Sequence, residues 1–468
     1  MTEPLTNVTN ETDTVSVWTP YEPDDDAPWN LRRVVHLHRR VVFGACWSEI
    51  QRDLAQGPAA AVTRVIDGKV RAEGVPEGFE QLAGVIGAAA VDSGSAERLQ
   101  AWWLYRCLFS PHPLEERLTL TWHNHFATSN LKLHDLRLMK QQNDTLRTHA
   151  LSPFGVLLRD IVHDPALLEW LDASSNRAGQ PNENLARELM ELFTLGIGNY
   201  SEDDVKEAAR ALTGWMVRQN KFRNLESLHD EGEKTILSRT GNFDGDDLVD
   251  ILLAHSATAK RLAWRICSMF FGEATAGGEA IEALAAGLTE RKLDIGWAVE
   301  TVLRSQKFHA AENLGGRILG PAEYVIGAVR ALEMLDPAPS TVALAEWVGR
   351  LGQDLFYPPN VGGWNEGRSW LNARTALGRI NFATALVEGK LSSTGQPFDP
   401  TRLAAKHGQD TDALQIVRFH ADLLLGGQPS DGWCERLLEK LKPHVKDDAE
   451  LLRKAVAGIF SSAEAQLA

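Results

Sequence analysis

Apolar residues recur at spacings of three and four along most of the chain from residue 30 onwards. The segments LRRVVHLHRRVVFG, SAERLQAWWLYRCLFS and LEERLTLTWHNHFATS are examples, and the pattern continues, after one interruption, to about residue 335. Such spacing places apolar side chains on one face of an α-helix. The sequence therefore predicts a mainly α fold, a large and irregular body of many helices.

The interruption covers residues 215–245, where WMVRQNKFRNLESLHDEGEKTILSRTGNFDG is polar and holds only short β-compatible pieces. We expect a small β-hairpin or a long loop inserted into the helical body. Just before it, a helix over 183–195 is expected to end at Gly196 and Gly198. Ser201, with Asp204 three residues on, resembles a capping box for the next helix.

Changes in composition divide the chain into three parts. Residues 1–29 form an acidic leader that we expect to be disordered. Residues 30–390 carry the helical pattern and are predicted to form one domain, and the polar stretch LSSTGQPFDPTR then marks a boundary. Residues 391–468 are predicted to be a small helical C-terminal appendage.

The formal net charge of −15 narrows the classes of partner. Nucleic-acid binding needs clustered Lys and Arg, so neither nucleic acid nor an anionic membrane surface is expected. No signal peptide is visible, and no stretch is long and apolar enough for a membrane span, so we predict a cytoplasmic protein. The four cysteines form no CxxC pair, which fits thiols in a reducing compartment.

The predicted helix over 183–195 carries the densest candidate chemistry. Asn184, Glu188 and Glu191 share one face, at i, i+4 and i+7, and Glu183 and Arg187 lie on an overlapping face. The helix also carries many apolar residues, and buried carboxylates need partners. Arg187 can pair with one or two of these carboxylates, and a metal ion could neutralise the rest.

Two further motifs carry histidines. In TWHNHFATSN, His123 and His125 would lie about 200° apart on a helix, so one site holds both only at a helix end or kink. Their spacing excludes the zincin pattern, which needs histidines at i and i+4. In LHDEGEK, His229 and Asp230 could supply a metal ligand with its orienting partner or a proton-transfer pair.

Each motif also has a purely structural interpretation. Lone histidines in helical proteins are usually structural, the carboxylates could form an ion-pair network with Arg187 and Arg210, and His229 with Asp230 could make an Asx-type turn. Tryptophans are expected mainly as core anchors. The sequence contains no Walker A loop, no GxSxG elbow and no GxGxxG after a strand, so no nucleotide cofactor is expected.

Taken in order, the motifs resemble a known bacterial family. The segments that carry the resemblance are HLHRRVVFG, TWHNHFAT, PNENLARELMELFTLGIGNYSEDDVKEAARALTGW, LHDEGEK, GPAEYVIGAVRAL and PPNVGGW. They are similar to the family catalogued as domain of unknown function 1800, over roughly residues 30–390. Many members of that family look exported, and this chain departs from that pattern because it has no visible signal.

The resemblance implies an activity only faintly, namely metal-dependent oxidation of a small aromatic substrate. The family's motif positions fall here on His123, Asn124, His125, Asn182, Glu183, Asn184, Arg187, Glu188, Glu191, His229, Asp230 and Lys234. The resemblance alone assigns no catalytic role to any of them.

The first hypothesis is a metal-dependent oxidoreductase or oxygenase that acts on a small, possibly aromatic, molecule. One or two metals, Fe first and otherwise Mn, Co or Zn, would be bound by His123, His125, Glu188, Glu191 and His229.

In this hypothesis, Asp230, Lys234 and Glu183 are the predicted catalytic residues. Asp230 would orient a histidine ligand, Lys234 would hold a substrate carboxylate, and Glu183 would pair with Arg187. The predicted substrate-binding residues are Arg187 and Asn184.

The second hypothesis is a non-catalytic helical binding or assembly protein. Its polar motifs would be buried networks that fix helix packing, and its acidic surface would serve a protein partner. A metal-free enzyme with His229 and Asp230 as acid and base is a third. The hypotheses differ in one respect: a metal site requires segments 123–125, 188–191 and 229–230 to converge within a few Å.

Overall fold

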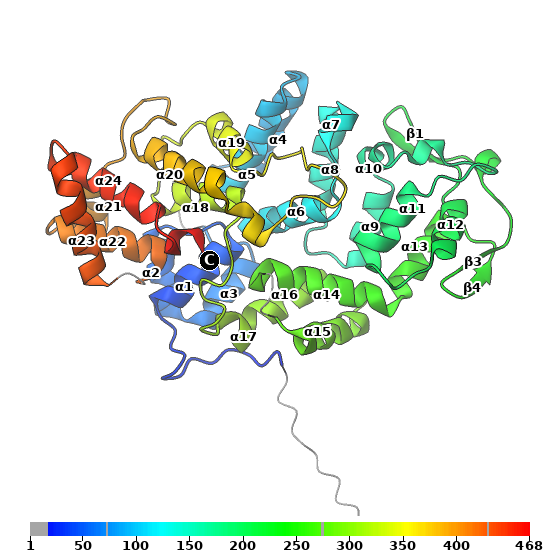
Figure 1. The fold of residues 1–468 in the computed structure, drawn as a ribbon, viewed down its shortest axis with the longest axis horizontal. Coiled ribbons are helices and arrows are strands. Elements are labelled where there is room, and N and C mark those ends of the chain that lie inside the picture. Colours follow the sequence, from blue (N-terminus) through cyan, green and yellow to red (C-terminus); the bar gives the residue numbers. More distant parts are fainter. Residues whose placement is uncertain (1–16, 72–73, 273–275, 428–429) are drawn as a thin grey trace, which may run out of the picture.

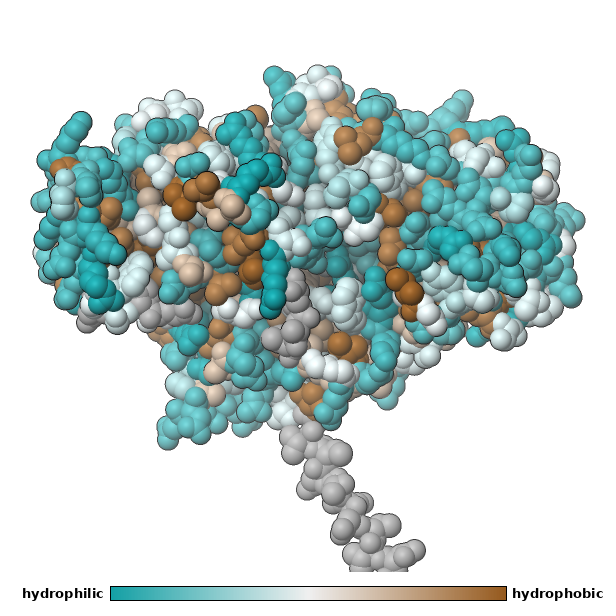
Figure 2. Space-filling view, in the orientation of Figure 1, coloured by the Kyte–Doolittle hydropathy of each residue, from teal (hydrophilic) through white to brown (hydrophobic). Residues whose placement is uncertain are grey.

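A computed structural model describes residues 17–71, 74–272, 276–427 and 430–468. The described chain is mainly helical, with two small antiparallel strand pairs, as the sequence predicts (Figure 1). The C-terminal helices form one end of an elongated molecule, and the strand pairs with their neighbouring helices form the other. The face seen in this view is mostly hydrophilic, with apolar patches scattered over it (Figure 2). Within the described residues, no helix is both long enough and apolar enough to cross a membrane.

The first half of the chain folds into a run of short and medium helices. These are α1 (Leu31–Val41), α2 (Trp47–Gln56), α3 (Pro58–Ile66), α4 (Phe79–Asp92), α5 (Ala96–Phe109), α6 (Pro113–His125), α7 (Asn130–Leu133), α8 (Leu136–Thr148), α9 (Phe154–Val162), α10 (Pro165–Trp170), η1 (Ala173–Ser175), α11 (Asn184–Glu188), η2 (Leu189–Thr194), α12 (Glu202–Ala211) and η3 (Glu226–Leu228).

The second half continues in the same way. Its helices are α13 (Gly245–Ala254), α14 (Ser256–Phe271), α15 (Gly278–Glu290), α16 (Ile295–Arg304), α17 (Gln306–His309), α18 (Pro321–Ala331), α19 (Thr341–Arg350), η4 (Gly367–Trp370), α20 (Ala373–Val387), α21 (Pro400–Lys406), α22 (Ala413–Leu425), α23 (Asp431–Leu441), η5 (Lys442–His444), α24 (Asp448–Phe460) and η6 (Glu464–Gln466).

The insertion predicted over 215–245 consists of two β-hairpins. Strand β1 (Trp215–Arg218) pairs with β2 (Lys221–Asn224), and β3 (Lys234–Ile236) pairs with β4 (Arg239–Gly241). Both hairpins turn through two residues of positive φ, at 219–220 and 237–238. Two such residues match the right-handed twist of the flanking strands, so each hairpin is tight.

The helix predicted over 183–195 is present over residues 184–194 and ends before Gly196, but it is not α-helical throughout. Only α11 is α-helical, and η2, which follows it, is a π-helix. The Thr194 hydroxyl donates to the Leu189 carbonyl at 2.5 Å, and the Leu195 and Gly196 N–H groups both donate to the carbonyl of Met190. Wider turns of this kind change which residues share a face. The capping box of Ser201 and Asp204 is confirmed.

Two large apolar clusters form the interior. The first joins α1, α5, α18, α20, α22 and α24, and the second joins α6, α9, α12, α13, α14 and α16. The first cluster runs without a break across the boundary predicted near residue 390. Trp122 and Trp215 are buried in the second cluster, and Trp364 and Trp370 in the first, so these tryptophans are core anchors.

Part of the predicted leader is ordered. Residues 1–16 lie outside the described residues, but Trp18 and Tyr21 lie against the helical body. The Trp18 indole N–H donates to the Ala280 carbonyl at 3.1 Å, and the Tyr21 N–H donates to the Arg304 carbonyl at 2.8 Å. The acidic composition of residues 1–29 did not predict this docking, because the contacts come from the Trp18 side chain and the Tyr21 backbone rather than from acidic groups.

Candidate functional site

The His-Asn-His motif ends helix α6, at the place where the two apolar clusters meet. The His123 ring lies among Trp103, Phe356 and Trp364, all members of the first cluster, and its centroid is 5.3–5.7 Å from theirs. Neither ring nitrogen of His123 has a hydrogen-bond partner in the described structure. Burial lowers the pKa of His123 to about 3, so its imidazole is neutral.

His125 points into the second cluster instead. Its Nε2 lies 3.1 Å from the Phe193 carbonyl, and its ring contacts Trp122, Phe126 and Phe154. Burial, with the positive charges of two arginines of α14, lowers its pKa well below the ordinary value. The two histidines therefore lie on different sides of α6, as their spacing on a helix predicts.

Asn124, between them, binds a distant glycine-rich loop. Its side-chain oxygen accepts a hydrogen bond from the Trp364 N–H at 2.7 Å, and its Nδ2 donates to the Trp364 carbonyl at 3.4 Å. Gly363 lies directly against Asn124, where a Cβ would come within 2.5 Å of the Asn124 carbonyl oxygen. The motifs TWHNHFAT and PPNVGGW are therefore two halves of one buried contact.

The carboxylates of α11 and η2 form two separate groups at the surface. Arg187 pairs with Glu202 at 2.8 and 3.0 Å and with Glu183 at 3.0 Å. Glu191 accepts a hydrogen bond from the Tyr200 hydroxyl at 2.6 Å. Burial and the neighbouring Glu191 raise the pKa of Glu188. Arg187, predicted to bind substrate, is thus engaged by two glutamates of its own chain.

The LHDEGEK motif, which contains His229 and Asp230, folds against the C-terminal end of α12. The His229 Nδ1 lies 3.0 Å from the Thr213 carbonyl, and Asp230 binds Arg210 through both carboxylate oxygens at 2.9 and 3.0 Å. This ion pair, with Arg210 as its largest cause, lowers the pKa of Asp230 to about 2. Lys234 is buried, and its Nζ donates to the Gly232 and Asp230 carbonyls. This motif is a folded turn around a buried lysine.

The predicted metal ligands therefore occupy different surroundings. Within the described residues, no group of three or more His, Cys, Asp or Glu side chains is placed so that it could hold a metal ion. His123, His125 and His229 contact aromatic rings or backbone carbonyls, whereas Glu191 binds Tyr200 and lies near Glu188. The five predicted ligands are therefore not gathered into one such group, and the ligand and catalytic roles stay predictions.

Sequence reasoning missed a group of side chains on α14. Arg265 pairs with Glu366 at 3.2 Å and donates to the Thr121 carbonyl at 3.4 Å. Arg261 stacks on Trp264, with its guanidinium carbon 4.6 Å from the ring centroid, and donates to the Leu192 carbonyl at 3.4 Å. The spacing Arg-x-x-Trp-Arg in RLAWR was the available signal, since i, i+3 and i+4 lie on one helix face.

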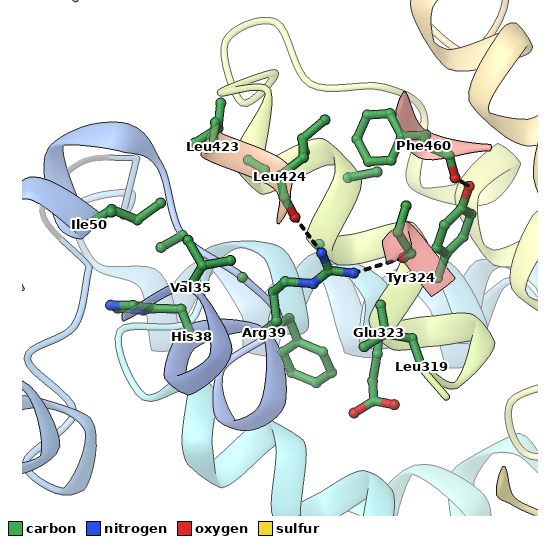
Figure 3. Close-up of a pocket in the computed structure, with 17 residues that line it drawn as sticks. Val35, His38, Arg39, Ile50, Leu319, Glu323, Tyr324, Leu423, Leu424 and Phe460 are labelled. Atoms are coloured by element: carbon green, nitrogen blue, oxygen red, sulfur yellow. Dashed lines mark hydrogen bonds between the residues drawn. The ribbon is translucent and has the colours of Figure 1, made fainter. Parts of the chain in front are cut away.

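A small cavity lies between α1, α18 and the C-terminal helices (Figure 3). It has a volume of about 40 Å³, and most of its lining is apolar. Arg39 crosses it from α1 and donates to the carbonyls of Leu424 and Ala465. The Tyr324 hydroxyl donates to the Phe460 carbonyl at 3.1 Å. These contacts join α1 and α18 to the C-terminal region.

Comparison with known proteins places the chain in a family. Residues 36–467 match the family described as Protein of unknown function (DUF1800). No curated protein and no solved structure matches the chain. The match begins in α1 and ends one residue before Ala468, so it includes the His-Asn-His motif, the Asn124–Trp364 contact and the helices after residue 390. The chain therefore belongs to the DUF1800 family of proteins of unknown function.

Proposed function

We propose that this protein is a non-catalytic helical binding or assembly protein. The observation that carries the proposal is that motif side chains are engaged by other motif segments. Asn124 binds the backbone of Trp364, His125 binds the Phe193 carbonyl, and Asp230 binds Arg210. Satisfied polar networks of this kind rigidify a body and specify its packing. The motifs would then preserve a rigid platform whose surface meets a protein partner.

A cytoplasmic location is part of the same proposal. Its support is that all four cysteines are buried and that none of them forms a disulfide, which is typical of a reducing compartment. Nucleic acid and membrane remain unexpected partners because the net charge is −15.

The deciding experiment is elemental analysis by plasma mass spectrometry on full-length protein purified without a metal-affinity step. The variants are His123→Ala, Glu188→Ala and Asn124→Ala, each also measured for unfolding by urea. We expect no stoichiometric metal in the wild type, and lower stability for His123→Ala and Asn124→Ala. Stoichiometric Fe, Mn, Co or Zn that is lost in His123→Ala and Glu188→Ala but kept in Asn124→Ala would overturn the proposal.

A metal-dependent oxidoreductase acting on a small aromatic molecule is a second candidate. Two observations favour it: the buried His123 imidazole has no hydrogen-bond partner in the described structure, and burial together with the neighbouring Glu191 raises the pKa of Glu188. Mixed imidazole and carboxylate donors suit Fe, Mn, Co or Zn. The same elemental analysis, followed by oxygen-uptake assays with any metal-loaded preparation, separates this candidate from the first.

A further inference from the structure

Arg261 differs from the other cations that stack on tryptophan among the residues that the structure describes. Each of the others also has a carboxylate partner: Lys132 with Asp172, Lys140 with Asp144, Arg147 with Glu116, Arg291 with Glu290, and Arg350 with Glu346. Arg261 stacks on Trp264 but has no carboxylate partner among the described residues. Arg261 is therefore the one tryptophan-stacked cation among the described residues that has no carboxylate partner.

The Arg261 guanidinium is also partly withdrawn from solvent. Its Nε atom is buried without a hydrogen-bond partner in the described structure, and its one hydrogen bond, to the Leu192 carbonyl, is long at 3.4 Å. Burial and the positive charge of Arg265 lower its pKa. A partly buried cation without a counter-charge is costly, and Arg binds carboxylates best through two parallel N–H groups. The arrangement favours an external anion.

Large apolar side chains flank this cation. Trp264 is 40% exposed, and Ile197, which follows Gly196 beside the Arg261 side chain, is 81% exposed. The turn is held in place, because Asn199 donates to the Leu195 carbonyl at 3.0 Å and Gly196 packs near the Arg261 side chain. An exposed tryptophan, an arginine and an aliphatic side chain on rigid supports resemble the anchors that dominate protein interfaces.

The shape of this surface points to a protein rather than to a small molecule. Small ligands occupy concave sites, whereas Ile197 stands at the tip of a turn between Gly196 and Gly198, both with positive φ. A projecting side chain can instead be covered by a partner segment that lies across it.

We propose that Arg261, Trp264 and Ile197 form a docking site for a segment of a partner protein that places an Asp or Glu carboxylate beside a large apolar side chain. The carboxylate binds the Arg261 guanidinium, and the apolar side chain packs on Trp264 and Ile197. This inference rests on the proposed function as a binding protein, and it names the surface and the chemistry of the partner.

The test uses full-length protein and two synthetic peptide libraries, read by fluorescence anisotropy. In one library Asp or Glu is flanked by Leu, Phe or Trp, and in the other Asn or Gln replaces the acid. The variants are Arg261→Gln, Trp264→Ala and Ile197→Ser. Arg291→Gln is the matched control, because Arg291 stacks on Trp297 at 4.4 Å but already has Glu290 as its partner. Thermal melts confirm that each variant is folded.

We expect peptides of the acidic library to bind. Peptides of the neutral library should bind at least about tenfold more weakly. Arg261→Gln and Trp264→Ala should weaken acidic binding by a similar factor, while Arg291→Gln leaves it unchanged. Equal binding of both libraries, no binding of either, or equal binding by Arg261→Gln and the control overturns this site. Concentration-dependent self-association that Trp264→Ala abolishes would make the occupant a second copy, which also overturns it.

The two proposals fail in different ways. Stoichiometric metal in the wild type would overturn the non-catalytic function, whether or not the peptides bind at Arg261. Metal-free protein that binds neither library would leave the function proposal in place and remove only the docking site.

Discussion

The side-chain oxygen of Asn124 accepts a hydrogen bond from the Trp364 backbone N–H at 2.7 Å, although 240 residues separate the two in the chain. Asn124 belongs to the helix that separates the two apolar clusters, and Trp364 belongs to the first cluster. Because both partners are buried, no water replaces this bond if one of them is removed. The contact therefore fixes a long loop on the end of α6.

Asn124→Ala should lower the free energy of unfolding by about 2 kcal/mol or more, because it leaves a buried N–H and a buried carbonyl of Trp364 without their partner. Urea unfolding followed by circular dichroism measures the change. Asn184→Ala is the control, since Asn184 lies at the start of α11 and is only half-buried. Equal losses for the two variants would contradict the special role of Asn124.

Gly363→Ala should lower the stability of the fold by more than the backbone strain at its positive φ alone would cause. Gly363 has φ +80°, and an added Cβ would meet Asn124. Gly395 is the matched control, because it has φ +64° but open space around the Cβ position. We expect Gly395→Ala to cost about 1 kcal/mol from backbone strain and Gly363→Ala to cost at least about 1–3 kcal/mol more from overpacking. Similar melting temperatures for both variants would refute the close contact.

The helical fold was predictable because local patterns determine it. Apolar spacing predicted the helices, and the polar segment 215–245 predicted the β insertion. The capping box of Ser201 and Asp204 followed from residue types alone. The π-helix over Leu189–Thr194 did not, because its hydrogen bonds depend on how η2 packs against α13 and α14 rather than on local propensity.

The candidate site was less predictable. The spacing of His123 and His125 correctly placed them on different sides of a helix, but spacing does not reveal which rings or carbonyls lie opposite. The Asn124–Trp364 contact joins residues that no local pattern relates. The sequence did not indicate a role for Arg261, because the absence of a nearby carboxylate can be recognised only from the folded structure.

Asp164 should make stability depend on pH near neutrality. Burial raises its pKa to about 7, against hydrogen bonds from Leu167 and Gln142 that oppose the shift. A folded-state pKa above the unfolded one means that the native state binds more protons. This contribution is therefore fully present below about pH 4 and is lost as the pH rises towards 7, at up to about 1.4 kcal/mol per pH unit.

The measurement is the difference in unfolding free energy between wild type and Asp164→Asn at several pH values from 4 to 8. The wild type should become less stable relative to Asp164→Asn as the pH rises. Asp412→Asn is the matched control, because Asp412 caps α22 through the same kind of bond, from the Gln415 N–H at 2.9 Å, but is exposed. A flat difference for Asp164→Asn would show that its carboxyl titrates as in the unfolded chain.

His123→Phe tests whether the aromatic surroundings of His123 are structural. The ring lies among Trp103, Phe356 and Trp364 with both nitrogens unbonded, so a phenylalanine of similar size should fit at a cost below about 1.5 kcal/mol at pH 8. A folded-state pKa of about 3 lies below the ordinary 6.5, so the native state binds fewer protons. The wild type should therefore lose stability, relative to His123→Phe, as the pH falls from 6.5 towards 3.

Urea unfolding at pH 5 and pH 8 measures this effect, with His444→Phe as the control at an exposed histidine. Structural packing requires that His123→Phe be nearly as stable as the wild type at pH 8 and gain on it at pH 5, while His444→Phe shows no such gain. A loss of several kcal/mol at pH 8 would mean that the imidazole makes a polar contact that phenylalanine cannot replace. Normal stability with loss of a bound metal would instead assign His123 to a metal site.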